Sequence, residues 1–567
     1  MQKEFIYVLP IYLIMTTIIK KMINDNAYFY AVKSARVNGK PRIVSQVYLG
    51  TADNIVEMKK QCESLPYIKM KSFEYGKLAA LLHVNEELGF VDIVNKRTNK
   101  RSIEGLSVGE YLLLDIVGKS HGVLSENSIG EWFKKSAFSF MLDFPHKLSC
   151  QNFLNQMSYI DSDTMKNIED DLCRVLVEKG FTPSVLFVDE SNWFTYATNY
   201  DEESELLYKG YNKKHRKDKN QICVALATNE DNIPFIHETY PGNVHDSEEF
   251  SGIIDKIINR LTELNICSED LVLVFDKGNN SKDNINRVTS KMNFVGAVKA
   301  NQAEELLEVP LSNYQFLYKS SEDHKIYGYR TKHQFYGTEF TTVITFNEGT
   351  YKLQKRTYES NKSKIIENLE DLQRRLESTR GKARSRSRVE TEVADIIMKK
   401  YRSVVKYEII DAIEGQKKPQ LKFWIDEENE NKCEKSFGKN LLFTDKHQWH
   451  TKKIVQTYNN KNNIEDDFKL LNDHLLVPVG PVYHHKDENI RVHVFLSVIG
   501  LLFYRYLAWE TKRYGFSMRK LIKKLSEIRL AIVQEKKSNI CEIILEEMDT
   551  KQASLFSFLN LGKFLPS

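Results

Sequence analysis

The chain has 567 residues, of which 41% are hydrophobic, so it is too long for one ordinary domain and can bury several cores. Its formal net charge of +4 is small, which leaves a nucleic-acid partner compatible with the composition but not required by it. Seven cysteines without a Cys-x-x-Cys pair argue against a disulfide framework and against a zinc site of ordinary spacing, and they fit a reducing, cytosolic setting.

The first segment in chain order is an apolar stretch from Phe5 to Ile19, interrupted by Pro10. It is shorter than the roughly 20 residues that a membrane span needs, and it lacks a signal-peptide cleavage site. We therefore expect residues 1–21 to be an upstream extension outside the fold. A membrane anchor is the alternative interpretation.

Residues 22–75 alternate short β-like runs with turns, and Asn38-Gly39 between two such runs is a strong hairpin signal. Residues 76–180 turn helical, with capped, amphipathic segments that start near Leu106 and Ser128. The helical part is either a DNA-binding module or a packing domain without a ligand, and the pattern favours neither.

The next segment predicts three strands that can form a meander, followed by α, β, α and β. This order is typical of a ribonuclease-H-like α/β core, which we assign to residues 181–301 and 445–510. The expected elements are strands 184–189, 221–229 and 233–240, helix 246–264, strand 271–276, helix 281–291 and strand 294–299.

Residues 302–444 break this pattern and are expected to form an insertion domain with charged helices. One helical face is apolar at Ile365, Leu369, Leu372 and Leu376. The basic cluster 380–388 favours phosphate contact over a merely solvated helix, because five positive charges without an acid would otherwise repel one another.

The chain then continues into an apolar helix, and residues 511–567 should form a basic helical tail. The helix from Ile490 to Trp509 contains Arg491, His493 and Arg505, so we expect it to cover the sheet rather than to cross a membrane.

Three acids stand in contexts that would bring them together. Asp189 and Asp276 each end an apolar run that predicts a buried strand, and in a ribonuclease-H-like fold these two positions are neighbours. Glu465 lies on a helix whose apolar face is formed by Ile464, Phe468 and Leu471. Each acid alone has an ordinary explanation, such as a turn cap, but their joint occurrence predicts one carboxylate site.

Such a site suits phosphodiester cleavage. Two divalent ions about 3.5–4 Å apart can activate the attacking oxygen and stabilise the leaving one. Mg²⁺ prefers carboxylate oxygens, so no His or Cys is needed. Asp189 is the best candidate to bridge both ions, with Asp276 and Glu465 each holding one.

Basic side chains near the acids would position a nucleic-acid backbone. Lys213, Lys214 and Arg216 lie in a basic loop between the first two strands, for which a solvated hairpin is the alternative, and Lys461 precedes Glu465 by one helical turn. His245 and the pair His484-His485 lack the spacing of a helical zinc motif, and we interpret them as loop and turn residues. No Walker loop, G-x-G-x-x-G or G-x-S-x-G motif is present, which argues against nucleotide-driven and serine-hydrolase chemistry.

The chain resembles the DDE transposases of bacterial insertion sequences, in the group with the Tyr-x2-Arg-x3-Glu-x6-Lys signature around the third acid. The likeness extends from about Tyr28 to Ile532. It rests on Gly39-Lys-Pro-Arg, Tyr48-Leu-Gly50, Leu106-Ser-Val-Gly-Glu-Tyr, Gly130-Glu-Trp, Pro241-Gly-Asn-Val-His-Asp-Ser247, Asp276-Lys-Gly278, Ile464-Glu465, Pro481-Val-Tyr-His484 and Ile490-Arg-Val-His493.

The resemblance implies a ribonuclease-H-like core with an insertion domain, and Asp189, Asp276 and Glu465 as ligands of two Mg²⁺ ions, for which Mn²⁺ can substitute. It also implies hydrolysis at the element's ends, then strand transfer of the 3′-hydroxyl into target DNA. The implied partners are double-stranded DNA, as terminal inverted repeats and target, and a second copy of the chain in a homodimer assembled on DNA. The implied setting is the bacterial cytoplasm, in association with the nucleoid and not with a membrane.

The signature is only partly kept. Tyr458 matches its tyrosine, Lys461 stands at its arginine and Asn472 at its lysine, where Lys469 could supply the missing charge. Two alternatives to an active transposase stay open. One is a degenerate transposase that binds DNA without catalysis, and the other is a non-transposing nuclease of the same fold.

Overall fold

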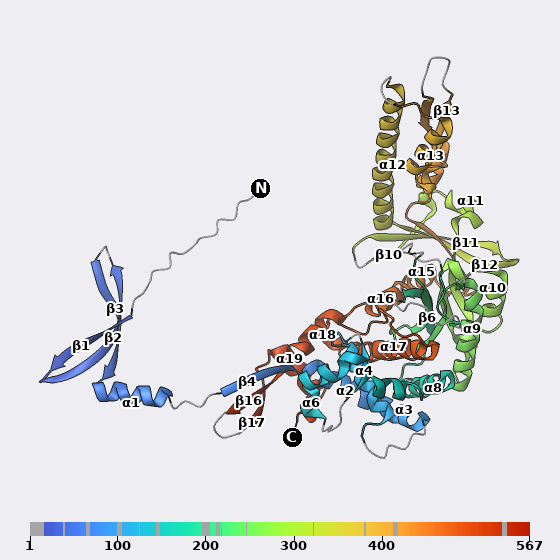
Figure 1. Ribbon diagram of the computed structural model, residues 1–567. Helices are drawn as coiled ribbons and strands as arrows, with labels where there is room; N and C mark the ends of the chain where they lie inside the picture. The colour runs from blue at the N-terminus through green and yellow to red at the C-terminus, as the bar shows by residue number, and fades with distance from the viewer. Residues whose placement is uncertain are drawn as a thin grey trace. The chain divides into compact units, whose positions relative to one another are not determined.

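The computed structural model shows a mixed α/β protein with two compact units (Figure 1). One unit comprises Met1–Phe73 with Arg529–Glu547, and the larger one comprises Glu74–Ile528 with Met548–Ser567. The structure describes residues 16–37, 40–63, 68–98, 105–123, 125–142, 148–195, 204–210, 216, 218–244, 246–320, 322–378, 382–411, 418–535 and 541–566.

The larger unit begins with helices, as the sequence predicts. The start of α4 is fixed by a capping box, in which the Ser107 side chain accepts from the Glu110 amide and the Glu110 carboxylate accepts from the Ser107 amide. The helices are α2 (Gly76–Leu88), α3 (Phe90–Thr98), α4 (Val108–Lys119), α5 (Glu126–Lys135), α6 (Phe138–Met141), α7 (Cys150–Met157) and α8 (Ser162–Glu178).

A nine-stranded sheet follows, and its first elements occur in the expected order. β5, β6 and β7 form an antiparallel meander, whereas β8 and β9 run parallel to β5 on its other side. β6 is buried along its whole length. The elements are β5 (Val185–Phe194), β6 (Gln221–Asn229), β7 (Pro234–Pro241), α9 (Asp246–Glu263), β8 (Val272–Phe275), α10 (Lys282–Thr289) and β9 (Asn293–Val298).

The strands of the expected insertion continue this same sheet. The full strand order is β10-β11-β12-β15-β9-β8-β5-β6-β7, and β15 joins β9 antiparallel. Residues 302–444 are therefore not wholly separate from the core, because backbone pairing carries the sheet through them. The added strands are β10 (Gln315–Lys319), β11 (Lys325–Phe335), β12 (Thr338–Asn347) and β15 (Lys439–Thr444).

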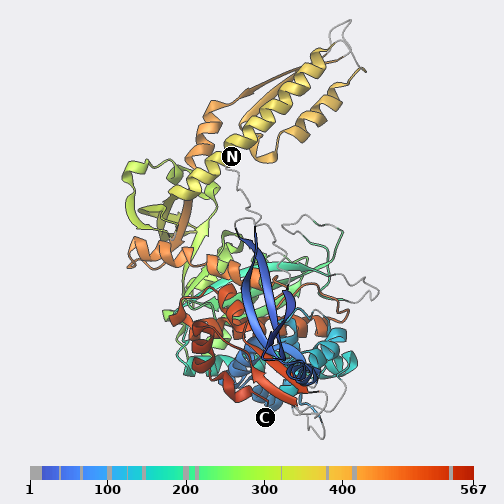
Figure 2. The same ribbon diagram turned by 90° about the vertical axis from the view of Figure 1, so that its left-hand side faces the viewer.

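The middle of residues 302–444 has a hydrophobic core of its own. Figures 1 and 2 show α12 and α13 side by side, projecting from the sheet strands. The four apolar positions predicted for one face of α12, from Ile365 to Leu376, are all buried there against Val389 and Val393. This projection contains α12 (Glu348–Glu377), α13 (Arg386–Ile396), β13 (Val405–Ile410), β14 (Gln420–Ile425) and α14 (Glu427–Lys435).

Three helices then return to the main sheet: α15 (Thr451–Asn459), α16 (Asn462–Leu470) and α17 (Asp487–Glu510). α17 is long and apolar enough to cross a membrane by length and composition, but 83% of its apolar window is buried inside the protein. It packs against α2, α4 and β7. Arg505 of α17 reaches Asp467 of α16 at 2.5 Å, which fixes the two helices to each other.

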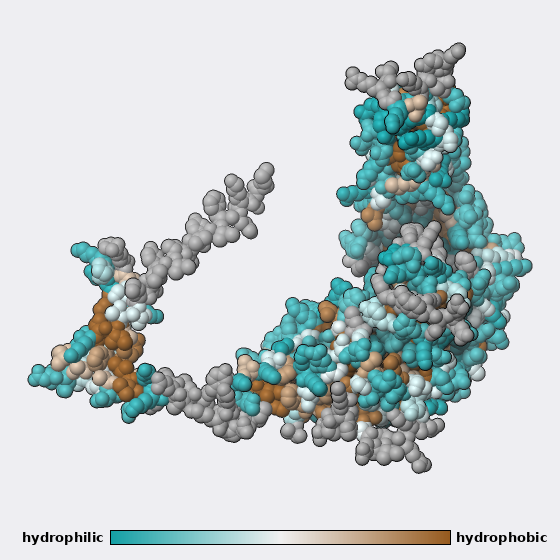
Figure 3. Space-filling view, viewed as in Figure 1, coloured by the Kyte–Doolittle hydropathy of each residue, from teal (hydrophilic) through white to brown (hydrophobic). Residues whose placement is uncertain are grey.

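The smaller unit contains two three-stranded sheets. β1 (Thr16–Ile23), β2 (Asn26–Val37) and β3 (Lys40–Gly50) form an antiparallel meander, with α1 (Ala52–Glu63) after it. β1 begins inside the segment expected to lie outside the fold, because its β-branched residues pair one for one with β2. Figure 3 shows apolar side chains on this sheet, including the exposed Ile18, Met22, Ile43 and Val47. The expected turn at Asn38-Gly39 and the residues before Thr16 lie outside the described residues.

The second sheet corrects the expected helical tail. It has the order β17-β16-β4, formed by β4 (Ile68–Glu74), β16 (Arg529–Glu535) and β17 (Cys541–Leu545). The β-branched pattern of Arg529-Leu-Ala-Ile-Val favours a strand here. The helices α18 (Met518–Ser526) and α19 (Thr550–Phe558) flank these strands in sequence and belong to the larger unit.

Candidate active site

Asp189 lies in β5, and Asp276 directly follows the adjacent parallel strand β8. The register of the two strands ends with the pair of Phe187 and Val274, and each acid stands two residues beyond that pair. Adjacent strands are about 4.8 Å apart, which makes these two carboxylates neighbours. The sequence predicts these two acids to be neighbours in a ribonuclease-H-like fold.

The sequence predicts that the strand ends at Asp189. In the structure, β5 continues to Phe194. Residues Glu190 to Phe194 pair antiparallel with β6, and Trp193 among them is buried. Asp189 is therefore in mid-strand, and the polar residues Glu190, Ser191 and Asn192 that follow it are paired with β6. Asp276, by contrast, follows β8 directly, and its carboxylate accepts a hydrogen bond from the Lys277 amide at 2.8 Å.

Glu465 lies in the first turn of α16, and its side chain is exposed. The apolar face predicted for this helix is present, since Ile464, Phe468 and Leu471 are buried. Contacts of α16 with β5 place the helix beside the strand that carries Asp189. The expected single helix is two helices, however, and Lys461 stands at the start of α16 instead of one turn inside a helix that contains Glu465.

Each aspartate contacts a side chain from the end of α15 or from the connection of α15 to α16. Lys461 Nζ lies 3.1 Å from Asp189 Oδ1, and the side chains are only 8% and 17% exposed. The Tyr458 hydroxyl donates to Asp276 Oδ1 at 3.5 Å. Burial raises the pKa of the Tyr458 phenol, and the negative charges of Asp276 and Asp189 raise it further, so the hydroxyl keeps its proton.

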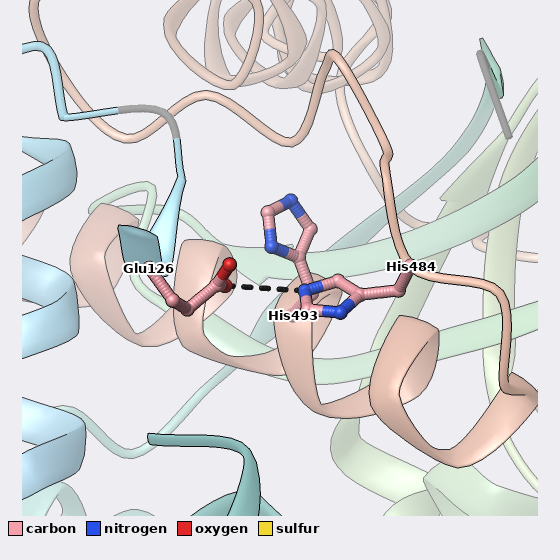
Figure 4. Close-up of side chains that lie close together, drawn as sticks. All are labelled: Glu126, His484 and His493. Atoms are coloured by element: carbon pink, nitrogen blue, oxygen red, sulfur yellow. Dashed lines mark ion pairs between the residues drawn. The ribbon is translucent and has the colours of Figure 1, made fainter. Parts of the chain in front are cut away.

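The structure does not gather all three acids at metal-bridging distance. Among the described residues, the group of His, Cys, Asp or Glu whose ligand atoms all lie within 4.8 Å of one another is Glu126, His484 and His493 (Figure 4). Asp189 and Asp276 are adjacent, and Glu465 is on the neighbouring helix without joining them at that distance. The candidate site therefore has Asp189 and Asp276 on the sheet and Glu465 on the helix beside it.

The other predicted basic residues do not converge on Asp189. Lys469 is 70% exposed and pairs with Asp466 at 2.7 Å, and Arg216 pairs with Asp218 at 2.7 Å. Lys213 and Lys214 lie outside the described residues. Of the predicted DNA-contacting residues that the structure describes, Lys461 is thus the one that pairs with Asp189.

Asn472 has a specific contact where the signature has a lysine. Its Oδ1 accepts from Trp193 Nε1 at 2.9 Å, and its Nδ2 donates to the Phe468 carbonyl at 2.7 Å. The rings of Trp193 and Phe468 also approach each other, with centroids 5.9 Å apart. Asn472 therefore ties the end of α16 to β5, four residues beyond Asp189.

The sequence interpretation missed the group of Glu126, His484 and His493. His484 does lie in a loop, as expected, but its Nε2 pairs with Glu126 Oε1 at 3.2 Å (Figure 4). Burial alone would raise the pKa of Glu126, yet the hydrogen bond and charge of His484 outweigh it and bring that pKa down to about 2. The available signal was a lone histidine, His493, inside a largely apolar helix.

No family model and no curated protein matches the chain. Among solved structures, the chain is similar to the Mos1 transposase paired-end complex with left transposon end, at 9% identity and a TM-score of 0.15. This similarity covers 36% of the chain and 63% of the solved chain. A TM-score this low carries no argument about fold or function, so the site has to be interpreted from its own residues.

Proposed function

We propose that this protein is a DDE transposase of an insertion sequence, with a ribonuclease-H-like core. The observation that carries the proposal is the parallel register of β5 with β8, because Asp189 and Asp276 each stand two residues beyond its last pair, Phe187 with Val274. Around them, the strand order β7-β6-β5-β8-β9 and the meander-then-parallel directions support the ribonuclease-H-like assignment. The sheet strands and the projection between β9 and α15 are consistent with an insertion within such a core.

The donor set suits two Mg²⁺ ions, for which Mn²⁺ can substitute. Asp189 in β5 and Asp276 after β8 offer carboxylate oxygens, and the exposed Glu465 can join them through movement of its own side chain or of α16. The Lys461 ammonium already pairs with Oδ1 of Asp189, so an ion that takes this oxygen would have to displace the ammonium. The ions would supply an activated nucleophile and charge relief at the leaving oxygen.

The neighbouring side chains of the chain would hold these acids ready. Lys461 keeps Asp189 in one orientation and, once released by a competing cation, is placed to contact a DNA phosphate. Tyr458, in the last turn of α15, donates to Asp276 and orients that carboxylate. Both residues come from the segment that carries Glu465, which couples the position of the third acid to the first two.

The projection offers a second surface for the phosphate backbone. Arg375, Lys382, Arg384, Arg388 and Lys418 line a hollow of about 340 Å³ there. Arg384 and Arg388 share the acid Glu392, which leaves an excess of positive charge around the hollow. We propose that this surface contacts double-stranded DNA when two copies of the chain assemble on the terminal inverted repeats and target, in the bacterial cytoplasm.

The test uses the purified full chain, Mg²⁺ and an oligonucleotide that carries the inverted repeat flanking the reading frame. The expected products are a nick at the repeat's end and a joint between the freed 3′-hydroxyl and a second duplex. Asp189→Asn, Asp276→Asn and Glu465→Gln should each abolish both products while binding stays within about threefold, since one lost ligand removes the metal chemistry without the phosphate contacts. Asp466→Asn, one residue from Glu465 and also exposed, is the matched control and should stay active.

Two other outcomes would replace the proposal. Nicking without joining would make the protein a non-transposing nuclease of this fold. Binding without nicking, in a folded chain with both Mg²⁺ and Mn²⁺, would make it a degenerate transposase. An active Glu465→Gln variant would remove that residue from the site.

A further inference from the structure

Glu126, His484 and His493 come from three different parts of the larger unit and meet in its interior. Glu126 is the first residue of α5, His484 lies in the loop before α17, and His493 lies within α17. Figure 4 shows the His493 ring beside the pair that Glu126 forms with His484. Their ligand atoms all lie within 4.8 Å of one another.

The hydrogen bond of His493 fixes which of its nitrogens is available. Nε2 lies 2.8 Å from the Val479 carbonyl, and since a carbonyl only accepts, Nε2 carries the proton. The lone pair is then on Nδ1, which is buried and has no hydrogen-bond partner among the described residues, in a side chain only 5% exposed. A buried imidazole nitrogen without a partner needs an explanation, and a bound ion is one that the surrounding ligands support.

The hydrogen bond from His493 Nε2 to the Val479 carbonyl is of a kind that metal-bound histidines usually make. A ligating histidine commonly donates its second N–H to a backbone carbonyl, which sets the tautomer and the ring orientation. The Val479 carbonyl does this for His493.

The surrounding charges tolerate a cation. Lys119 Nζ donates to the His493 carbonyl at 3.1 Å, but its charge is balanced by Asp115 at 3.2 Å, and both residues are buried. This leaves the Glu126 carboxylate as the net negative charge of the group. A divalent ion that replaces the proton shared by Glu126 and His484 therefore meets a compensating charge.

We propose that Glu126, His484 and His493 bind one divalent transition-metal ion of the Zn²⁺ type, which joins α5 to α17. Two imidazoles and one carboxylate are a usual ligand set for Zn²⁺, whereas Mg²⁺ and Ca²⁺ prefer oxygen ligands alone. Tetrahedral Zn²⁺ ligands stand about 3.3 Å apart, given Zn–N bonds of about 2.0–2.1 Å. The Glu126–His484 separation of 3.2 Å already fits, and the 4.8 Å limit means that His493 has at most about 1.5 Å to close.

The test is a metal titration of the tag-free full chain after dialysis against a chelator. We expect one equivalent of Zn²⁺ per chain by elemental analysis, and one equivalent of Co²⁺ with the visible spectrum of a tetrahedral site. His484→Ala and Glu126→Gln should weaken Zn²⁺ binding at least about 10- to 100-fold. Substitution of a residue that only hydrogen-bonds to a metal ligand already causes a loss of this size. His485→Ala is the matched control, since His485 is the adjacent, exposed histidine, and it should bind like the unchanged chain.

Two further variants separate this site from its alternatives. His484→Cys should keep one equivalent and add a sulfur-to-cobalt band to the Co²⁺ spectrum, which a purely structural histidine would not produce. Asp189→Asn should also keep the ion, so the result does not depend on the proposed transposase site. Binding of Zn²⁺ by the unchanged chain that is no tighter than binding by His484→Ala would overturn the proposal, as would loss of the ion in Asp189→Asn alone.

Discussion

Lys461 Nζ lies 3.1 Å from Asp189 Oδ1, and this contact ties the connection between α15 and α16 to the middle of β5. Both side chains are largely buried, so little water screens the pair. A divalent ion that binds Asp189 has to displace this ammonium. Lys461 is thus both a support for the acid and a competitor for it.

Lys461→Gln should destabilise the chain without Mg²⁺ by about 3–5 kcal/mol, because removing one partner of a buried pair leaves the other charge uncompensated. The same change should make stabilisation by Mg²⁺ larger than in the unchanged chain, since the freed Asp189 carboxylate gains most from a new cation. Thermal unfolding midpoints with and without Mg²⁺ measure both effects.

Lys469→Gln is the control for Lys461, because Lys469 forms an exposed pair with Asp466 on the same helix. Its effect should stay within about 0.5 kcal/mol. Equal midpoints for Lys461→Gln and Lys469→Gln would show that the Asp189 contact does not persist in solution.

Asn472→Ala should loosen α16 on β5. The change removes the acceptor of the buried Trp193 indole N–H, and an unsatisfied buried donor costs about 1–3 kcal/mol. Asn472→Lys should behave alike, because a lysine ammonium cannot accept a hydrogen bond. Amide exchange of residues 462–470 followed by mass spectrometry measures the loosening.

The control for Asn472 is Asn463→Ala on the same helix. The Asn463 side chain has no hydrogen bond to any described residue, so its truncation should leave exchange in α16 nearly unchanged. Exchange that is the same in the Asn472 and Asn463 variants would contradict the anchoring role of Asn472.

Local periodicity was enough to predict much of this fold. The order of elements from β5 to β9 and the buried face of α12 follow from apolar spacing, which reflects contacts of a residue with its own strand or helix. Both features need no knowledge of distant partners. The expectation that Asp189 and Asp276 are neighbours, by contrast, came from the ribonuclease-H-like arrangement assigned to their strands.

The features that the sequence did not predict depend on contacts between residues that are distant in the chain. The extension of β5 beyond Asp189 depends on its partner β6, and the pairing of β15 with β9 brings the insertion's strands into the main sheet. The sequence predicts Lys461 as a phosphate contact. In the fold, its ammonium group pairs with Asp189. Likewise, Glu126 and His484 are far apart in the chain, and no local pattern relates them.

Gly130→Ala should destabilise the helical module, because a Cβ atom at this position would lie 2.4 Å from the Leu148 carbonyl oxygen. Overpacking costs about 1–3 kcal/mol, which exceeds the gain of up to about 1 kcal/mol from replacing glycine in a helix. Gly252→Ala in α9 is the control. Its nearest contact is Glu249 Oε1 at 3.6 Å, so only the helix gain remains and the unfolding midpoint should rise. Midpoints that shift in the same direction would contradict the close contact at Gly130.

Glu169 should make the stability of the larger unit depend on pH in the acid range. Burial alone would raise its pKa, but His237 and Arg260, which both contact its carboxylate, bring the pKa down from 4.5 to about 2. A carboxyl whose pKa is lower in the folded state stabilises the fold above its unfolded pKa, and this contribution is lost as the pH falls from about 4.5 to about 2. The shift corresponds to about 3 kcal/mol.

Glu169→Gln tests this, because the amide resembles the protonated acid at every pH. The variant should be less stable than the unchanged chain by about 3 kcal/mol at pH 7, and the difference should shrink between pH 4.5 and pH 2 as the wild-type carboxylate gains its proton. Unfolding midpoints at pH 7, 4 and 3 measure the trend. Glu263→Gln, in a surface pair with Lys166, should change stability by less than about 1 kcal/mol at each pH. A Glu169→Gln deficit that stayed constant down to pH 3 would mean that the lost stability comes from packing and not from the charge of Glu169.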